Sequence, residues 1–114
     1  MADVVLYTGD SLVLNIAVAD SNGEDADISN AQASAYGIFN LAGEQLVSKR
    51  QGFGVEITVN IVTVTILPAD TVDLPPGTYV QELEVIDAEA LVHTVYQGTI
   101  ELRRGYIYSE EVEE

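Results

Sequence analysis

The sequence contains no cysteine, which excludes disulfide bonds, thiolate metal sites and cysteine nucleophiles. It has no tryptophan, two phenylalanines and one histidine, so neither a large aromatic-lined cleft nor a histidine metal cluster is indicated. No stretch approaches the roughly 18 apolar residues of a membrane span, and no basic region followed by an apolar run opens the chain. We therefore expect a soluble protein made without a signal peptide.

Positive charge is also scarce. Four basic residues stand against 19 acidic ones, which gives a net charge of −15 and an isoelectric point near 4.1. The basic residues form only the pairs Lys49-Arg50 and Arg103-Arg104, which cannot line a phosphate backbone. Nucleic acids and anionic membrane surfaces are therefore not expected as partners. The acidity is better explained by a need for solubility than by binding to a specific cationic partner.

The chain does have a regular alternation of apolar and polar residues. Its 114 residues, 47% of them hydrophobic, suit one compact domain, which we assign to residues 1–105, followed by an acidic C-terminal tail at residues 106–114. The apolar residues are mainly valine, isoleucine and leucine, and they recur at every second position. This pattern predicts an all-β fold, an immunoglobulin-like antiparallel β-sandwich of about seven strands.

The alternation and its interruptions locate the expected strands. Strands are expected at residues 11–19, 32–39, 44–49, 78–87 and 91–103, and within the run 55–67. That run changes phase, so a tight turn or bulge is expected at Val59-Asn60. Turns are expected at residues 20–23 and 40–43, and residues 68–77 are expected to form a connector that contains one helical turn.

The last strand places the single histidine. The core side of this strand is assigned to Val92, Tyr96, Ile100 and Leu102. His93 falls out of phase with them, so we expect a solvated surface imidazole rather than a catalytic base. Together with the absence of a nucleophile elbow, this predicts no catalytic residues and no enzymatic activity.

The segment before residue 78 is the most specific local feature. Pro75, Pro76 and Gly77 lead into Tyr79 at the start of a strand. This arrangement resembles the tyrosine corner of immunoglobulin-like sandwiches, in which the tyrosine hydroxyl ties the strand to the preceding crossover. We assign these four residues a structural role. The alternative is an ordinary aromatic side chain at a strand start.

Residues 20–27 gather four carboxylates and an asparagine around Gly23, and such oxygen ligands suit calcium. The spacing does not match a known calcium loop, because glycine is fourth rather than sixth and the twelfth position is Ala31. A turn with solvated acids is therefore favoured, and no metal or other cofactor is predicted.

Four segments resemble a family of phage and prophage structural proteins, the N-terminal domain of upper baseplate and tail-fibre proteins. They are residues 7–20 with their Gly-Asp opening, the strand and Asp-Thr turn of residues 61–71, the Pro-Gly-x-Tyr strand of residues 74–85, and the Gly-Thr-Ile strand of residues 97–102. The resemblance covers roughly residues 7–104. Such domains are usually followed by a longer fibre, whereas this chain stops soon after its last strand.

The resemblance implies a non-enzymatic structural or attachment module of a phage or prophage tail, baseplate or fibre. Its partners would be other virion or tail proteins and further copies of itself, as a trimer or ring. It would be a virion component made in the bacterial cytoplasm. The outward-facing Val13, Val80 and Ile86 are candidate contacts between copies.

A second hypothesis remains open, an immunoglobulin-like binding module for a carbohydrate or protein ligand. Its candidate contact residues are Tyr36, Tyr96, Tyr106 and Tyr108.

Overall fold

A computed structural model describes residues 3–20 and 22–105 of the chain, so the acidic tail lies outside the described residues. The described residues form eight strands and one four-residue helix, which confirms the all-β prediction. The helix is far too short to cross a membrane, and no helix of the described part is long and apolar enough to do so. The elements are β1 (Val4–Tyr7), β2 (Leu12–Ala17), β3 (Ala33–Phe39), β4 (Gln45–Gln51), β5 (Gly54–Thr58), β6 (Ile61–Ile66), α1 (Pro68–Thr71), β7 (Gly77–Ile86) and β8 (Val92–Arg103).

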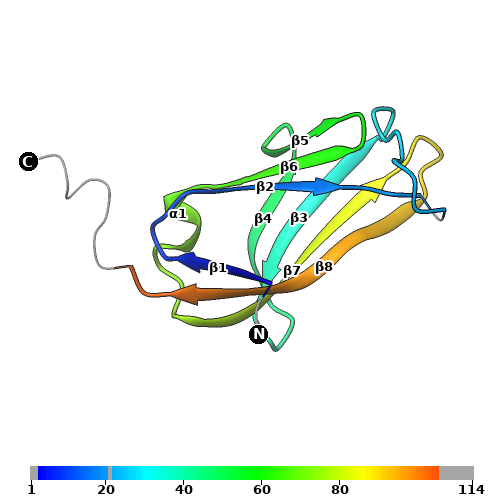
Figure 1. The fold of residues 1–114 in the computed structure, drawn as a ribbon. Coiled ribbons are helices and arrows are strands. Elements are labelled where there is room, and N and C mark those ends of the chain that lie inside the picture. The colour runs from blue at the N-terminus through cyan, green and yellow to red at the C-terminus, as the bar shows by residue number, and fades with distance from the viewer. Residues whose placement is uncertain (1–2, 21, 106–114) are drawn as a thin grey trace, which may run out of the picture.

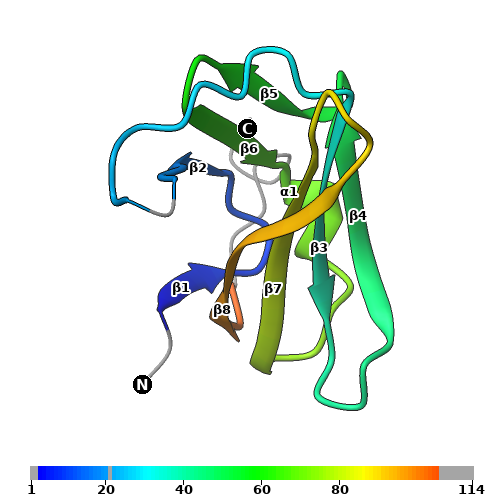
Figure 2. The ribbon, with the colours of Figure 1, turned by 90° about the vertical axis from the view of Figure 1, so that its right-hand side faces the viewer.

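All eight strands belong to one sheet, in the order β1-β8-β7-β3-β4-β5-β6-β2. The sheet curls into a nearly closed barrel, so its two edge strands, β1 and β2, come to lie on the same side (Figures 1 and 2). The pairs β1–β8 and β4–β5 are parallel and the other pairs are antiparallel. The expected immunoglobulin-like antiparallel β-sandwich of about seven strands is therefore corrected to a single mixed sheet of eight strands that forms a nearly closed barrel.

The core fills the inside of the barrel with side chains from every second strand position. On β6 and β7 the buried residues alternate with half-buried ones, as the period-two pattern predicts. The fully buried apolar side chains include Ile38, Val55, Val62, Val64, Ile66, Leu83 and Ile100.

Three connections use the same five-residue loop. In each, the side-chain oxygen of Asp20, Asn40 or Asp87 accepts hydrogen bonds from the backbone N–H groups two and four residues later. The fourth residue has a positive φ, 82° at Gly23, 92° at Gly43 and 69° at Ala90. The first two loops match the expected turns. The third departs from the pattern, because an alanine occupies the position that favours glycine.

The predicted turn at Val59-Asn60 joins β5 to β6, with Thr58 paired to Ile61. Val59 has a φ of 52°, which is strained for a β-branched residue. The carbonyl oxygens of Val59 and Asn60 accept hydrogen bonds from Ile28 N–H at 2.7 Å and Val18 N–H at 2.8 Å, so the loop between β2 and β3 docks onto this turn.

The connector after β6 contains the expected helical turn, α1. The carboxylate of Asp70 accepts a hydrogen bond from the Leu67 N–H at 2.7 Å and lies 2.7 Å from Lys49 Nζ. Both side chains of this ion pair are largely buried, so the pair ties α1 to β4.

Strand β8 differs from the prediction in two ways. Leu83 pairs with Tyr96 but Glu84 pairs with Thr94, so Val95 is an extra residue in a β-bulge. Beyond the bulge the inward and outward faces exchange. Val92, which we assigned to the core, is therefore 59% exposed. The second difference is β1, which was not among the expected strands and which pairs with the other half of β8.

Candidate functional site

The barrel is open along part of one side. Strand β1 pairs only with Ile100–Arg103 of β8, so the edge of β8 from Val92 to Gly98 has no partner strand among the described residues. Strand β2 pairs with β6 on one side, and its other edge is free of the described strands. The opening therefore lies between β2 and the first half of β8, next to β1.

A pocket of about 550 Å³ lies at the end of this opening. One wall comes from the connection that follows β2, and the other from the β7–β8 hairpin. Its lining residues are Val18, Ala19, Asp20, Ala26, Ile28, Val85, Asp87, His93, Thr94 and Val95. The lining is mainly apolar, and its three ionisable groups are two carboxylates and one imidazole.

The bulge at Val95 turns His93 toward this pocket. Because His93 pairs with the buried Val85, it lies on the inner face of the sheet rather than on the outer face we expected. Its side chain is nevertheless 53% exposed, because it sits at the open end of the barrel. This placement could not be predicted from the sequence, since a bulge leaves no pattern in the order of apolar residues.

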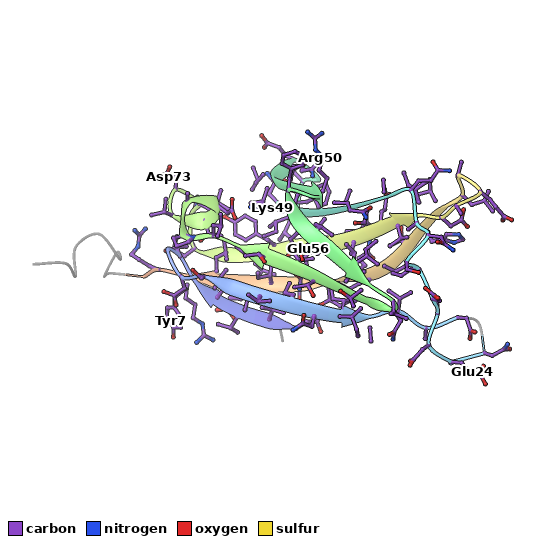
Figure 3. The ribbon with its side chains drawn as sticks, turned by 90° about the horizontal axis from the view of Figure 1, so that it is seen from above. Tyr7, Glu24, Lys49, Arg50, Glu56 and Asp73 are labelled. Atoms are coloured by element: carbon purple, nitrogen blue, oxygen red, sulfur yellow. The ribbon has the colours of Figure 1, made fainter. Side chains whose placement is uncertain are left out.

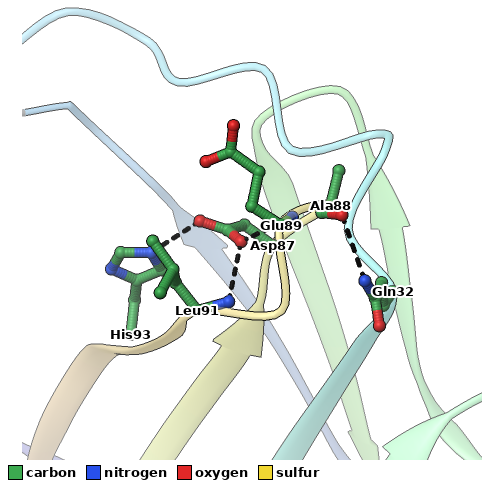
Figure 4. Close-up of polar contacts among 6 residues, drawn as sticks. All are labelled: Gln32, Asp87, Ala88, Glu89, Leu91 and His93. Atoms are coloured by element: carbon green, nitrogen blue, oxygen red, sulfur yellow. Dashed lines mark hydrogen bonds and ion pairs between the residues drawn. The ribbon is translucent and has the colours of Figure 1, made fainter.

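Asp87 is the centre of the polar contacts at this end (Figure 4). Its Oδ2 lies 2.9 Å from His93 Nε2, and its Oδ1 accepts the N–H groups of Glu89 and Leu91. The hydrogen bond with His93, followed by the backbone N–H of Leu91, lowers the pKa of the Asp87 carboxyl. The carboxylate at the pocket is therefore charged at neutral pH and held in one orientation.

Tyr79 lies where the tyrosine corner requires it. Its hydroxyl donates a hydrogen bond to the carbonyl oxygen of Pro75 at 2.6 Å, four residues earlier in the chain. The Tyr79 side chain is buried, and burial raises the pKa of its hydroxyl. This hydrogen bond ties the connector to β7, which begins at Gly77.

A polar network crosses the barrel interior. Tyr36 donates a hydrogen bond to Gln81 Oε1 at 2.7 Å, and Gln81 Nε2 donates to the hydroxyl of Tyr96 at 3.0 Å. Tyr36 and Gln81 are fully buried, and burial raises the pKa of the Tyr36 hydroxyl. Tyr36 is therefore corrected from a candidate surface contact to a core residue. Tyr106 and Tyr108 lie outside the described residues.

In the described part of the acidic segment, residue 20 and residues 22–27, two aspartates accept local hydrogen bonds of the kind found in turns. Asp20 Oδ1 accepts the N–H groups of Asn22 and Glu24, and Asp27 Oδ1 accepts the hydroxyl and the N–H of Ser29. These two hydrogen bonds, the hydroxyl first, lower the pKa of Asp27. Within residues 3–20 and 22–105, no three histidine or carboxylate side chains are placed so that they could share a metal ion.

The two edge strands carry no charged residue and no proline. Val5, Tyr7 and Val13 expose 44%, 46% and 55% of their surface. Figure 3 shows Tyr7 pointing away from the barrel. Of the other two candidate contacts, Val80 and Ile86 are half-buried. Edge strands of natural proteins are usually protected by charges, prolines or bulges, and β1 and β2 have none of these.

Comparison of the sequence with protein-family models and with curated proteins finds no match. The structure is similar to the crystal structure of CopC from Methylosinus trichosporium OB3b, a β-sandwich, with a TM-score of 0.54 and 12% sequence identity. The match covers 95% of this chain and 91% of that chain. At this level of identity the similarity shows a related all-β fold alone.

Proposed function

We propose that this protein is a non-enzymatic attachment module that contacts other proteins, including further copies of itself, by strand pairing at the open edges β1 and β2. The observation that carries the proposal is the composition of these edges. Neither strand has a charged residue or a proline, although the whole chain carries a net charge of −15. An unprotected strand edge is a template for a further strand, and side chains that alternate along it give specificity.

The resemblance to phage and prophage tail proteins supplies the proposed setting, a tail, baseplate or fibre. Electron microscopy of particles from a strain that carries this gene tests it, with an antibody against the protein as the label. Label at a fixed place on the particle would support the setting. Particles that lack the label in a preparation where the protein is expressed would contradict it.

Edge charges test the strand pairing. Val13 and Asn15 lie on the outer face of β2, so lysine at these positions leaves the core intact and places a charge along the edge. We expect Val13→Lys and Asn15→Lys to weaken association strongly in sedimentation equilibrium.

The matched control is Ala35→Lys, which adds the same charge to an exposed position of β3 that pairs with β4 on one side and β7 on the other. All three substitutions change the net charge equally, so a difference between them reports the position. If the edge variants and the control associate like the unmodified protein, the contact lies elsewhere and strand pairing at β2 is wrong.

A further inference from the structure

We propose that the pocket between the β2–β3 connection and the β7–β8 hairpin binds a small organic cation, an amine with an apolar body. The pocket volume of about 550 Å³ lies within the range of roughly 300–1,000 Å³ that is typical of small-molecule sites. This inference does not depend on strand pairing, because the residues that line the pocket lie outside β1 and β2 and the ligand is of a different kind.

The charge of the lining selects a cation. The two carboxylates, Asp20 and Asp87, face no lysine or arginine in the lining; the one other ionisable group there is His93, whose Nε2 lies 2.9 Å from Asp87 Oδ2. None of the four lysine and arginine residues of the chain is among the lining residues. Lys49 is paired with Asp70, Arg103 with Glu101, and the guanidinium of Arg50 lies 5.0 Å from the ring centre of Phe53.

The carboxylates are already positioned before a ligand arrives. In both, Oδ1 accepts two backbone N–H groups of its own loop. Ligand binding therefore need not order these side chains, and the loss of conformational entropy on binding is small. An ammonium group can then form charge-assisted hydrogen bonds with a fixed acceptor.

The rest of the lining fits an apolar body. Val18, Ala26, Ile28, Val85 and Val95 supply hydrocarbon surface beside the carboxylates. A hydrocarbon group would remove this surface from water while its ammonium group reaches the acidic side. A fully polar cation would leave the apolar wall exposed to water, and an anion would be repelled by the two carboxylates. The expected order of affinity is amine, then neutral analogue, then anion.

The test is a titration of the ¹⁵N-labelled protein with 2-phenylethylamine, in which binding is monitored by amide chemical shifts. The same titration with 2-phenylethanol and with phenylacetate provides a neutral and an anionic analogue for comparison. We expect the amine to shift the amide signals of residues 18–20 and 93–95, the alcohol to bind at least about tenfold more weakly, and phenylacetate to leave them unchanged. Equal shifts with all three compounds, or none with the amine at millimolar concentration, would overturn the proposal.

Two variants locate the site. Asp87→Asn keeps an oxygen that can accept the loop N–H groups but removes the charge, so the affinity for the amine should fall by about tenfold or more. Ala26→Leu fills the pocket without changing any charge and should abolish binding. The control is Asp73→Asn. Asp73 lies at the opposite end of the molecule from Glu24, which belongs to the same loop as the lining residue Asp20 (Figure 3), so this variant should bind the amine like the unmodified protein.

The same titration separates this proposal from the strand-pairing proposal. Val13→Lys should bind the amine with unchanged affinity even where it no longer associates. If Asp73→Asn weakens binding as much as Asp87→Asn, the amine responds only to overall charge, and the pocket is not its site.

Discussion

The hydroxyl groups of Tyr36 and Tyr79 make the same kind of contact in different surroundings. Removing the Tyr36 hydroxyl leaves Gln81 Oε1 without its donor inside the core. A buried acceptor without a partner costs the free energy of its desolvation, so we expect Tyr36→Phe to lower the free energy of unfolding by about 1–3 kcal/mol. Urea denaturation monitored by circular dichroism measures this change.

Tyr79→Phe removes a hydroxyl that binds the Pro75 carbonyl near the surface. Water can reach this region more easily than the barrel interior, so the expected loss is the ordinary net value of a hydrogen bond, about 1 kcal/mol, with the fold unchanged. The denaturation midpoint should fall at unchanged slope. An unchanged midpoint would mean that the ring alone stabilises the connector.

Individual residues show what the sequence could and could not predict. The Tyr79 contact was predictable, because the turn and the tyrosine are adjacent in the chain. The role of Gln81 was not, although it shares the period-two phase of Tyr79 and Leu83. Its partners Tyr36 and Tyr96 come from two other strands, and only the assembled barrel brings them together.

At the scale of elements, the three related loops allow a direct test of backbone strain. Ala90 occupies the left-handed position that glycine holds in the other two loops. We expect Ala90→Gly to stabilise the protein by about 0.5–1 kcal/mol, because relief of the left-handed strain exceeds the added flexibility of the unfolded chain. A thermal denaturation series measures the effect.

Gly43→Ala is the reverse substitution in the loop between β3 and β4. No atom lies within 4 Å of the added methyl group, so any loss of stability reports the backbone conformation alone. We expect it to destabilise the protein by a similar amount. Effects of equal size and opposite sign would show that the β3–β4 and β7–β8 loops have the same backbone requirement at this position. A destabilising Ala90→Gly would contradict this.

Elements that depend on local patterns were predictable, and those that depend on distant pairing were not. The β3–β4 hairpin and the turn at Val59-Asn60 follow from alternation and turn residues. Strand β1 was missed because four apolar residues become a strand only by pairing with β8, which lies about a hundred residues later in the chain. The bulge at Val95 was missed for a related reason, since only the register against β7 reveals the extra residue. The candidate pocket depends on that bulge.

At the scale of the whole molecule, the acidic charge and the uncharged edges have opposite effects on association between copies of the chain. A chain with a net charge of −15 repels its copies, while the edge strands β1 and β2 add no charge to a contact between them. Repulsion depends on salt, because the Debye length falls from about 30 Å at 0.01 M to about 8 Å at physiological ionic strength. Burial of apolar edge residues depends on salt far less.

Association should therefore strengthen as salt rises, and light scattering over a series of salt and protein concentrations measures this. We expect a monomer at low salt and a closed multimer, a trimer or ring, at physiological salt, since identical chains usually assemble with closed symmetry. A multimer that dissociates as salt rises would instead indicate specific ion pairs, for which Arg104 is a candidate because Arg103 already contacts Glu101. A monomer at every concentration up to the millimolar range would leave pairing with a different protein as the only use of the open edges.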